Sequence, residues 1–268
     1  MSTMQGKTVI ITGASSGIGE ELAVSFAARG ANLVLAARSE EALVRVKERC
    51  EKAGGRSLGV PTDVADPEAC RRMVERAVEV FGGIDMLVNN AGISMRSRFE
   101  DIRDVSLFER LMRVNYLGAV YCTHAALPHI KARKGLLVAI SSVQGKLAVP
   151  GRTGYVASKH ALQGFFDALR VELLDTGVDV LVVSPGYVST DLGVRALGSD
   201  GQPRATRDAA SDAMDASTCA ARILRAIDRR DRELLMTARA RLGVYLKLLF
   251  PGLVDRMALK ATQKRGGA

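Results

Sequence analysis

Short apolar runs alternate with longer amphipathic segments from the start of the chain, and this alternation limits the fold more than any other feature. The runs predicted as strands are residues 7–12, 32–37, 57–61, 86–89, 136–141, 179–184 and 233–236. Predicted helices lie between them at 18–29, 39–52, 67–81, about 105–132 and about 155–175. Strands that are apolar on both faces and separated by helices favour a parallel sheet covered on both sides. The sequence therefore predicts an α/β fold with a doubly wound parallel seven-stranded sheet, Rossmann-like, in a single domain.

A glycine-rich turn joins the first strand to the first helix. Residues 12–19 contain Gly13, Gly17 and Gly19 in a G-x3-G-x-G spacing. Gly13 permits a tight turn, Gly17 a close approach of the backbone to a ligand, and Gly19 close packing of helix on strand. An ordinary structural turn is the alternative. The position between an apolar strand and an amphipathic helix favours instead a dinucleotide whose pyrophosphate binds at the helix N-terminus.

The end of the second strand indicates which dinucleotide is bound. Enzymes that use NAD place Asp or Glu there, where the carboxylate binds the ribose 2′-hydroxyl and repels a 2′-phosphate. This chain has no carboxylate at that position, and Arg38 follows the strand directly. A guanidinium suits forked contacts to phosphate, and Ser15 and Ser16 could add hydroxyl donors. A solvated surface arginine is the alternative; we predict NADP(H).

Tyr155 and Lys159 form the second chemical signal. At positions i and i+4 of a helix they lie on one face, so the ammonium can lie below the phenol. A free tyrosine has a pKa of about 10, too high for useful proton transfer at neutral pH. A nearby positive charge favours the phenolate and lowers that pKa. Together with the glycine turn, the pair predicts an enzyme that transfers hydride.

Composition excludes several other classes of protein. Residues 238–268 carry six of the nine net positive charges, and aromatic residues make up only 4% of the chain, which argues against a nucleic-acid partner. Four scattered cysteines predict neither a disulfide framework nor a metal site. The first strand begins too early to leave room for a signal peptide. We therefore expect a cytoplasmic protein.

The basic segment 238–268 is also apolar. Residues 242–250 form an apolar run, and Pro251 can begin a second helix that continues the apolar pattern. The segment is too short and too charged to span a bilayer, but such a helix can lie in an anionic membrane surface. Packing on the core or on a partner subunit, over the substrate pocket, is an equal alternative.

With these motifs in order, the chain resembles the short, single-domain, NADP(H)-preferring branch of the short-chain dehydrogenase/reductase family, over roughly residues 5–237. Its tail is similar to that of members that reduce lipid-like carbonyls. The resemblance implies a catalytic tetrad of Asn115, Ser142, Tyr155 and Lys159. The cofactor contacts that it implies, together with those argued above, are Gly13, Ser15, Ser16, Gly17, Ile18, Gly19, Arg38, Asp63, Val64, Asn89, Ala91, Gly92, Tyr155, Lys159, Pro185, Gly186, Val188 and Thr190.

The family resemblance also implies a mechanism. Tyr155 would exchange a proton with the substrate oxygen while hydride passes between nicotinamide and the carbonyl carbon. Ser142 would hydrogen-bond the same oxygen, and Lys159 would lower the pKa of Tyr155 and bind the ribose. Asn115 would hold a water that joins Lys159 to solvent. Carbonyl reduction is the expected direction, since cellular NADPH is kept reduced.

Two other functions compete with this one. A catalytically silent NADP(H)-binding sensor could use the same fold, but it would be expected to lack Tyr155 or Lys159, and both are present. An epimerase or dehydratase that retains its cofactor would need a larger substrate domain, for which the chain has no room.

The remaining expectations concern organisation. Residues 1–237 should form the Rossmann-like dinucleotide-binding and catalytic domain, and 238–268 a basic apolar helical tail that is not a separate domain. Residues 193–217, polar and placed after the sixth strand, predict a substrate lid, with an ordinary mobile loop as the alternative. The two long helices carry more apolar and small residues than one buried face needs, which predicts a homodimer or homotetramer.

The substrate should be a small carbonyl or alcohol compound, and a hydrophobic one. Pocket walls are expected from residues 93–99, 143–153 and 187–217, with a contribution from the tail. The apolar residues in these segments favour a hydrophobic, steroid-like or lipid-like ketone; those singled out are Leu147, Val149, Val194 and Leu197.

Overall fold

A parallel sheet of seven strands, in the order β3-β2-β1-β4-β5-β6-β7, forms the centre of the computed structural model, which describes residues 4–204 and 213–264. The strands are β1 (Thr8–Thr12), β2 (Asn32–Ala37), β3 (Arg56–Pro61), β4 (Met86–Asn89), β5 (Leu136–Ile140), β6 (Asp179–Ser184) and β7 (Glu233–Leu235). Each predicted strand agrees with the observed one to within one residue at either end. Every residue of β1, β4 and β5 is buried, as the apolar runs predicted. The predicted fold class is confirmed.

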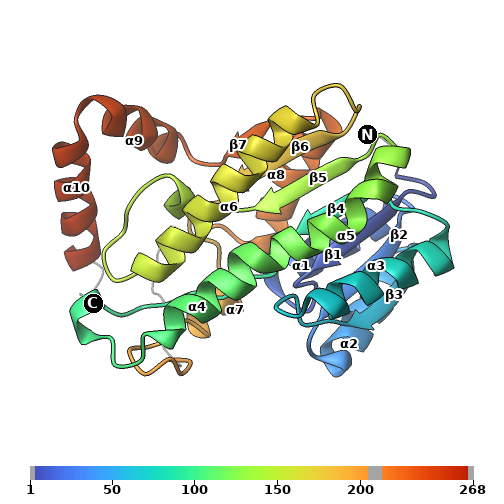
Figure 1. The fold of residues 1–268 in the computed structure, drawn as a ribbon, viewed down its shortest axis with the longest axis horizontal. Helices are drawn as coiled ribbons and strands as arrows, with labels where there is room; N and C mark the ends of the chain where they lie inside the picture. Colours follow the sequence, from blue (N-terminus) through green and yellow to red (C-terminus); the bar gives the residue numbers. More distant parts are fainter. Residues whose placement is uncertain (1–3, 205–212, 265–268) are drawn as a thin grey trace.

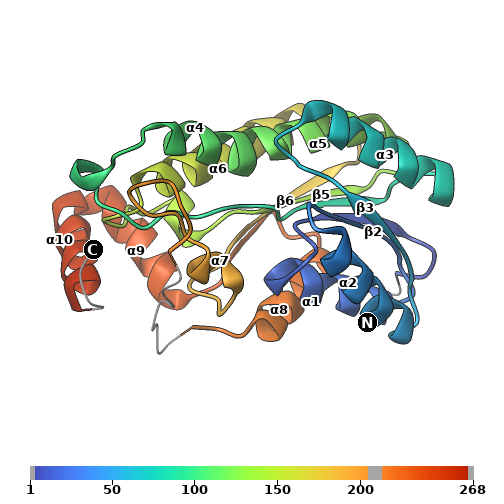
Figure 2. The ribbon, with the colours of Figure 1, turned by 90° about the horizontal axis from the view of Figure 1, so that it is seen from below.

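Helices cover both faces of this sheet (Figures 1 and 2). One face carries α1 (Gly17–Ala27), α2 (Glu40–Lys52) and α8 (Ala216–Asp228). The other carries α3 (Pro67–Phe81), α4 (Ser106–Met112), α5 (Gly118–Ala132) and α6 (Thr153–Glu172). Two apolar cores result, one on each face, with Phe26 fully buried in the first and Phe166 in the second. Burial on both faces fixes the register of the strands, because a slip would expose apolar side chains.

The prediction of one continuous helix over residues 105–132 is wrong in one respect. A π-helical turn, η2 (Arg113–Leu117), separates α4 from α5. Such turns insert one residue into the helical hydrogen-bond ladder and occur frequently at functional sites. The turn contains Asn115, whose side chain is buried. Regular helical periodicity on both sides of the turn conceals it in the sequence.

The strand order reverses direction between β1 and β4, which are neighbours in the sheet. The chain leaves β1 toward α1 on one face and leaves β4 toward α4 on the other. Loops that separate in this way open a crevice beyond the carboxyl ends of the strands, where ligands of doubly wound sheets bind. The fold therefore predicts a site at this junction.

Two helices, α9 (Ala238–Leu249) and α10 (Pro251–Lys264), extend the chain beyond β7 and lie at the left end of the molecule in Figure 1. The predicted C-terminal helical extension is thus confirmed. Thr237 caps α9 by accepting a hydrogen bond from the backbone N–H of Ala240 at 3.1 Å. Within 4–204 and 213–264, no helix has both the length and the apolarity needed to cross a membrane. Residues 205–212 of the predicted lid and Arg265 of the tail lie outside the described residues.

Candidate active site

A cavity of about 570 Å³ opens at the carboxyl ends of the strands. Its walls come from the glycine turn after β1 and from the segments that follow β2, β3, β4, β5 and β6. The predicted site residues that line it are Gly13, Ser15, Ser16, Gly17, Ile18, Arg38, Asp63, Val64, Ala91, Gly92, Ser142, Tyr155, Lys159, Pro185, Gly186, Val188 and Thr190. Residues from six parts of the sequence therefore meet at one site.

The turn after β1 fits a bound pyrophosphate. Gly13 has φ +64°, and a Cβ added there would lie 2.8 Å from the Cα of Ala91. A Cβ at Gly19 would lie 2.3 Å from the carbonyl oxygen of Gly13, so the turn closes only with glycine at both positions. Ser16 is the N-cap of α1 and, within the described residues, makes no capping hydrogen bond through its side chain. The first N–H groups of α1 can therefore meet an anion in the cavity.

A pair of polar residues ties the turn to the end of β4. The Thr12 hydroxyl accepts hydrogen bonds from the backbone N–H groups of Asn90, at 3.0 Å, and Ala91, at 3.1 Å. The side-chain amide of Asn90 donates in return to the carbonyl oxygens of Thr12, at 2.9 Å, and Gly13, at 3.1 Å. These contacts hold the two loops of the crevice at a defined separation.

Three predicted site residues do not line the cavity: Gly19, Asn89 and Asn115. Gly19 acts through packing, as expected. Asn89 faces away because strand side chains alternate, and its amide donates to the Thr123 hydroxyl at 3.0 Å; the lining residue is Asn90.

Asn115 is buried behind residues that line the cavity, such as Ile93. Its side-chain oxygen accepts from the backbone N–H of Ile93 at 2.8 Å, and its amide donates to the Ile93 carbonyl and to the Ser158 hydroxyl, both at 2.9 Å. The Asn115 side chain thus joins the loop after β4 to the helix that carries Tyr155.

The residues at the end of β2 form another part of the cavity lining. Arg38 directly follows the last strand residue, is exposed and lines the cavity. Arg45 on α2 donates to the carbonyl oxygen of Ser15 at 2.9 Å and to the buried carboxylate of Glu20 at 2.8 Å, which connects α2 to the glycine turn. The residues predicted to bind a 2′-phosphate, Arg38, Ser15 and Ser16, all line this cavity.

Tyr155 and Lys159 lie on α6 with 6% and 4% of their surfaces exposed. The Lys159 Nζ is 5.8 Å from the centre of the Tyr155 ring and donates to the Ile140 carbonyl at 2.8 Å. The Ser142 hydroxyl is hydrogen-bonded to the Tyr155 phenol and accepts from the Gln144 backbone N–H at 3.1 Å. The predicted one-face arrangement of phenol and ammonium is present.

The electrostatic balance at Tyr155 differs from the expectation. Burial raises the pKa of the Tyr155 phenol, and the hydrogen bond from Ser142 and the charge of Arg152 only partly oppose this effect. Burial also lowers the pKa of Lys159 to about 8. Desolvation therefore outweighs the effects that lower the phenol pKa, and Tyr155 keeps its proton at neutral pH.

A second cavity, of about 230 Å³, adjoins the first and shares Ser142 and Tyr155 with it. Most of its lining residues come from the three predicted segments, with Ser142, Tyr155 and Gly186 outside them, but they are more polar than predicted. Val194 lines this cavity and Leu197 the larger one, whereas Leu147 and Val149 line neither. Polar residues that the sequence reasoning did not single out are Ser94, Gln144, Arg152 and Tyr187.

Two further cations, Arg110 and Arg113, line the larger cavity and were also missed. Their only signal in the sequence was their position just before Asn115. The predicted lid does contribute to both cavities: Arg195 and Gln202 line the larger, and Gly193 and Ala213 the smaller.

Comparison with known proteins agrees with this geometry. A model of the short chain dehydrogenase family matches residues 7–198. Dehydrogenase/reductase SDR family member 7B from Bos taurus is 40% identical over 275 residues, covering 98% of this chain and 83% of the relative.

Two solved structures share the fold. A short chain dehydrogenase/reductase from Burkholderia phymatum in complex with NAD has a TM-score of 0.83 at 27% identity, over 94% of this chain and 96% of that one. An alcohol dehydrogenase from Thermococcus sibiricus complexed with 5-hydroxy-NADP has a TM-score of 0.74 at 26% identity, over 85% of this chain and 93% of that one. With the sheet order, the glycine turn and the Tyr155–Lys159 pair in one cavity, these matches show that the chain belongs to the short-chain dehydrogenase/reductase family of oxidoreductases.

Proposed function

We propose that the chain is an NADP(H)-dependent reductase that converts a hydrophobic ketone or aldehyde to an alcohol. One observation carries this proposal: Tyr155 and Ser142 line the same cavity as the glycine turn and Arg38. A dinucleotide held at the turn can therefore reach the reacting groups. One similar solved structure holds NAD and the other an NADP derivative. The preference for NADP(H) therefore rests on this chain's own residues: Arg38, the lack of a carboxylate at the end of β2, and the hydroxyls of Ser15 and Ser16.

Each of the residues that line the cavity has its own role in the proposed reaction. The nicotinamide, when bound, supplies the hydride. Pro185, Gly186 and Thr190 would hold its ring, since they line the cavity beside Tyr155. The Ser142 hydroxyl and the Tyr155 phenol would hydrogen-bond the substrate oxygen and stabilise the charge that develops on it. Tyr155 would then give this oxygen its proton.

The state of Tyr155 favours the reductive direction. A proton donor must be protonated before the reaction, and burial raises the pKa of this phenol. Lys159, with a pKa lowered to about 8, is still mainly an ammonium at neutral pH and can stabilise the phenolate left behind. The same buried pair would serve no purpose in a silent cofactor sensor, which remains the alternative.

Replacing Tyr155 with Phe removes the proton and keeps the ring. We expect NADPH affinity to stay nearly unchanged and turnover to fall at least about 100-fold, the usual range for loss of acid–base catalysis. NADPH oxidation across a carbonyl panel, with Tyr245→Phe on exposed α9 as the control, measures this. A wild type that binds NADPH but reduces no carbonyl would favour the sensor, and near-normal rates in Tyr155→Phe would remove Tyr155 as the donor.

Arg38 should set the cofactor preference. We expect NADPH to be favoured over NADH by about tenfold or more, since a charge-assisted contact contributes ~1.5–3 kcal/mol. Arg38→Asp should reverse the preference, while Arg225→Asp, on the exposed side of α8, changes the net charge equally and should not. Fluorescence titration gives both dissociation constants. Equal affinity of the wild type for the two cofactors would contradict the assignment.

We also propose that the chain forms a symmetric dimer or tetramer through α5 and α6. Ala157 and Ala168 on α6 are exposed and Ala161 is half-buried, while Val171 on the same helix is 63% exposed. Small and apolar residues on an outer helix face permit close packing against a second copy. Light scattering at micromolar concentration should give a multiple of 28.6 kDa, and Ala168→Arg should shift it toward the monomer. A monomer mass for the wild type would count against this assembly.

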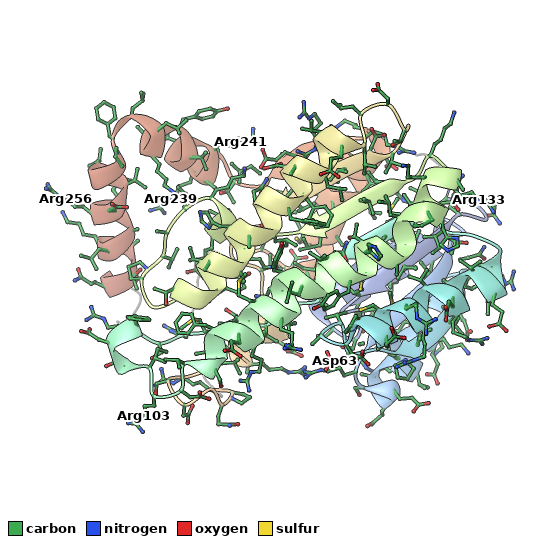
Figure 3. All side chains as sticks on the ribbon, in the orientation of Figure 1. Asp63, Arg103, Arg133, Arg239, Arg241 and Arg256 are labelled. Carbon is green, nitrogen blue, oxygen red and sulfur yellow. The ribbon has the colours of Figure 1, made fainter. Side chains whose placement is uncertain are left out.

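We further propose that the chain is cytoplasmic and that its C-terminal helices bind an anionic membrane surface. Part of the tail packs on the core, since Lys247 donates to the Lys146 carbonyl at 2.9 Å. The rest exposes large apolar side chains: Leu242, Tyr245, Leu248, Leu249, Phe250, Leu253, Met257 and Leu259. Basic Arg239, Arg241 and Arg256 lie on the same two helices (Figure 3). Apolar side chains flanked by basic ones suit an interfacial helix.

Leu248 and Leu249 are 76% and 74% exposed, so they test this contact. The full-length wild type should float with vesicles that contain phosphatidylserine at low salt. The double variant Leu248→Asp, Leu249→Asp should bind at least about tenfold less, because each leucine contributes roughly 1.5–3 kcal/mol when buried. Val44→Asp, an exposed apolar position on α2, is the matched control. If the wild type stays in solution, the membrane contact is disproved and the packing role of α9 remains.

A further inference from the structure

The smaller cavity contains a buried amide whose oxygen has no partner. Gln144 lines this cavity together with Ser142 and Tyr155 and is only 9% exposed. Its side-chain oxygen has no hydrogen-bond partner among the described residues. Buried side-chain amides in proteins are normally hydrogen-bonded, and an unpaired one costs free energy. Gln144 therefore calls for a partner that the described residues do not supply.

The other unpaired side-chain atoms of the described residues differ from that of Gln144 in their location. They belong to Asn89, Gln163 and Ser184, and none of these residues lines either of the two cavities. A molecule bound in these cavities can therefore supply the missing partner of Gln144 but not that of the other three.

The backbone holds Gln144 next to the reacting groups. Gln144 lies in the turn η3 (Val143–Gly145), and its backbone N–H donates to the Ser142 hydroxyl at 3.1 Å. The first residue of the turn donates its own N–H to the Pro185 carbonyl at 2.9 Å, which fixes the turn to the end of β6. Because Ser142 and Tyr155 would bind the reacting oxygen, a substrate group that reaches the Gln144 amide lies close to the reacting carbon.

The surroundings favour a neutral polar partner for Gln144. The charged residues that line the cavity have partners of their own: Asp191 pairs with Arg195 at 3.1 Å, and Arg152 donates to the Ser94 hydroxyl at 3.2 Å and is engaged in a further contact as well. A neutral amide matches a hydroxyl or a carbonyl. Because its oxygen and nitrogen can exchange places by rotation, the Gln144 amide can accept from a hydroxyl or donate to a carbonyl.

The size of the cavity is suited to part of a substrate. Its volume of about 230 Å³ is far above the ~10–15 Å³ that a single water requires. Apolar Val188 and Leu192 also line it, so a short carbon chain that carries the polar group can enter. A site with a buried polar group selects against a substrate that leaves this group unpaired.

We propose that Gln144 hydrogen-bonds a second, neutral polar group of the substrate, a hydroxyl or a carbonyl on the first or second carbon beside the reacting one. This inference rests on the proposed reduction at Tyr155 and narrows its substrates to hydrophobic carbonyl compounds that carry such a group. Gln144 is then a residue that determines specificity.

Binding of alcohols that resemble the product tests the contact without catalysis. Calorimetry on the full chain loaded with NADP⁺ should show 2,3-hexanediol or 2,4-hexanediol binding more tightly than 2-hexanol. Gln144→Met keeps the length of the side chain and removes the amide. This variant should weaken binding of the preferred diol about 3- to 10-fold, as expected for one neutral hydrogen bond, and leave 2-hexanol within about twofold.

Gln163→Met is the matched control, because Gln163 is similarly buried and has an unpaired side-chain oxygen but lines neither cavity. It should bind the diols as the wild type does. Diols that bind no more tightly than 2-hexanol, or equally well to the wild type and Gln144→Met, would disprove the contact.

Kinetics separate recognition from a structural role. For 3-hydroxy-2-hexanone, 4-hydroxy-2-hexanone and 2-hexanone, Gln144→Met should lower kcat/KM of the preferred hydroxyketone about 3- to 10-fold and leave 2-hexanone within about twofold. Gln144→Asn, which keeps a shorter amide, should retain part of the preference. An equal loss for all three ketones would show that Gln144 only holds the turn in place; the proposal would then be overturned while the reduction stands. If no carbonyl is reduced but diol binding still depends on Gln144, the proposed reaction fails and the contact stands.

Discussion

The junction of β1 and β4 is the constraint on which the rest of the site depends. Parallel strands there send their chains to opposite faces, and the Thr12 hydroxyl and the Asn90 amide bind the two loops to each other across the gap. The same contacts hold Gly13, whose left-handed backbone starts the turn into α1. Without this clamp, the N-terminus of α1 and the wall that carries Tyr155 would have no defined separation, and hydride transfer requires one.

Burial sets the pKa values of Tyr155 and Lys159 on the cavity wall formed by α6. Tyr155 and Lys159 are nearly excluded from water, so each disfavours its charged form: the pKa of the phenol rises and that of the ammonium falls to about 8. Ser142 and Arg152 oppose the shift at the phenol through a hydrogen bond and a charge. Tyr155 is therefore a protonated donor, and a further positive charge beside it, such as that of an oxidised nicotinamide, would bring the phenol closer to ionisation.

One loop connects this wall to the C-terminal helices. Lys146 follows η3 (Val143–Gly145), the turn that contains Gln144; its ammonium pairs with Glu233 of β7 at 2.7 Å, and its carbonyl accepts from Lys247 of α9 at 2.9 Å. The tail is thus attached to the backbone next to the smaller cavity.

The sequence by itself determined the sheet, the glycine turn and the Tyr155–Lys159 pair, because apolar periodicity and short-range spacing are local properties of the chain. Tertiary structure decided the rest. It placed Asn90 rather than Asn89 in the cavity and inserted a π-helical turn at Asn115, where contacts with Ile93 outweigh regular helix geometry. It also buried Arg152, which contacts Ser94 and Tyr187 from segments distant in sequence. Burial depends on contacts between distant segments, and for that reason the electrostatics of the site could not be predicted from residue types and spacing.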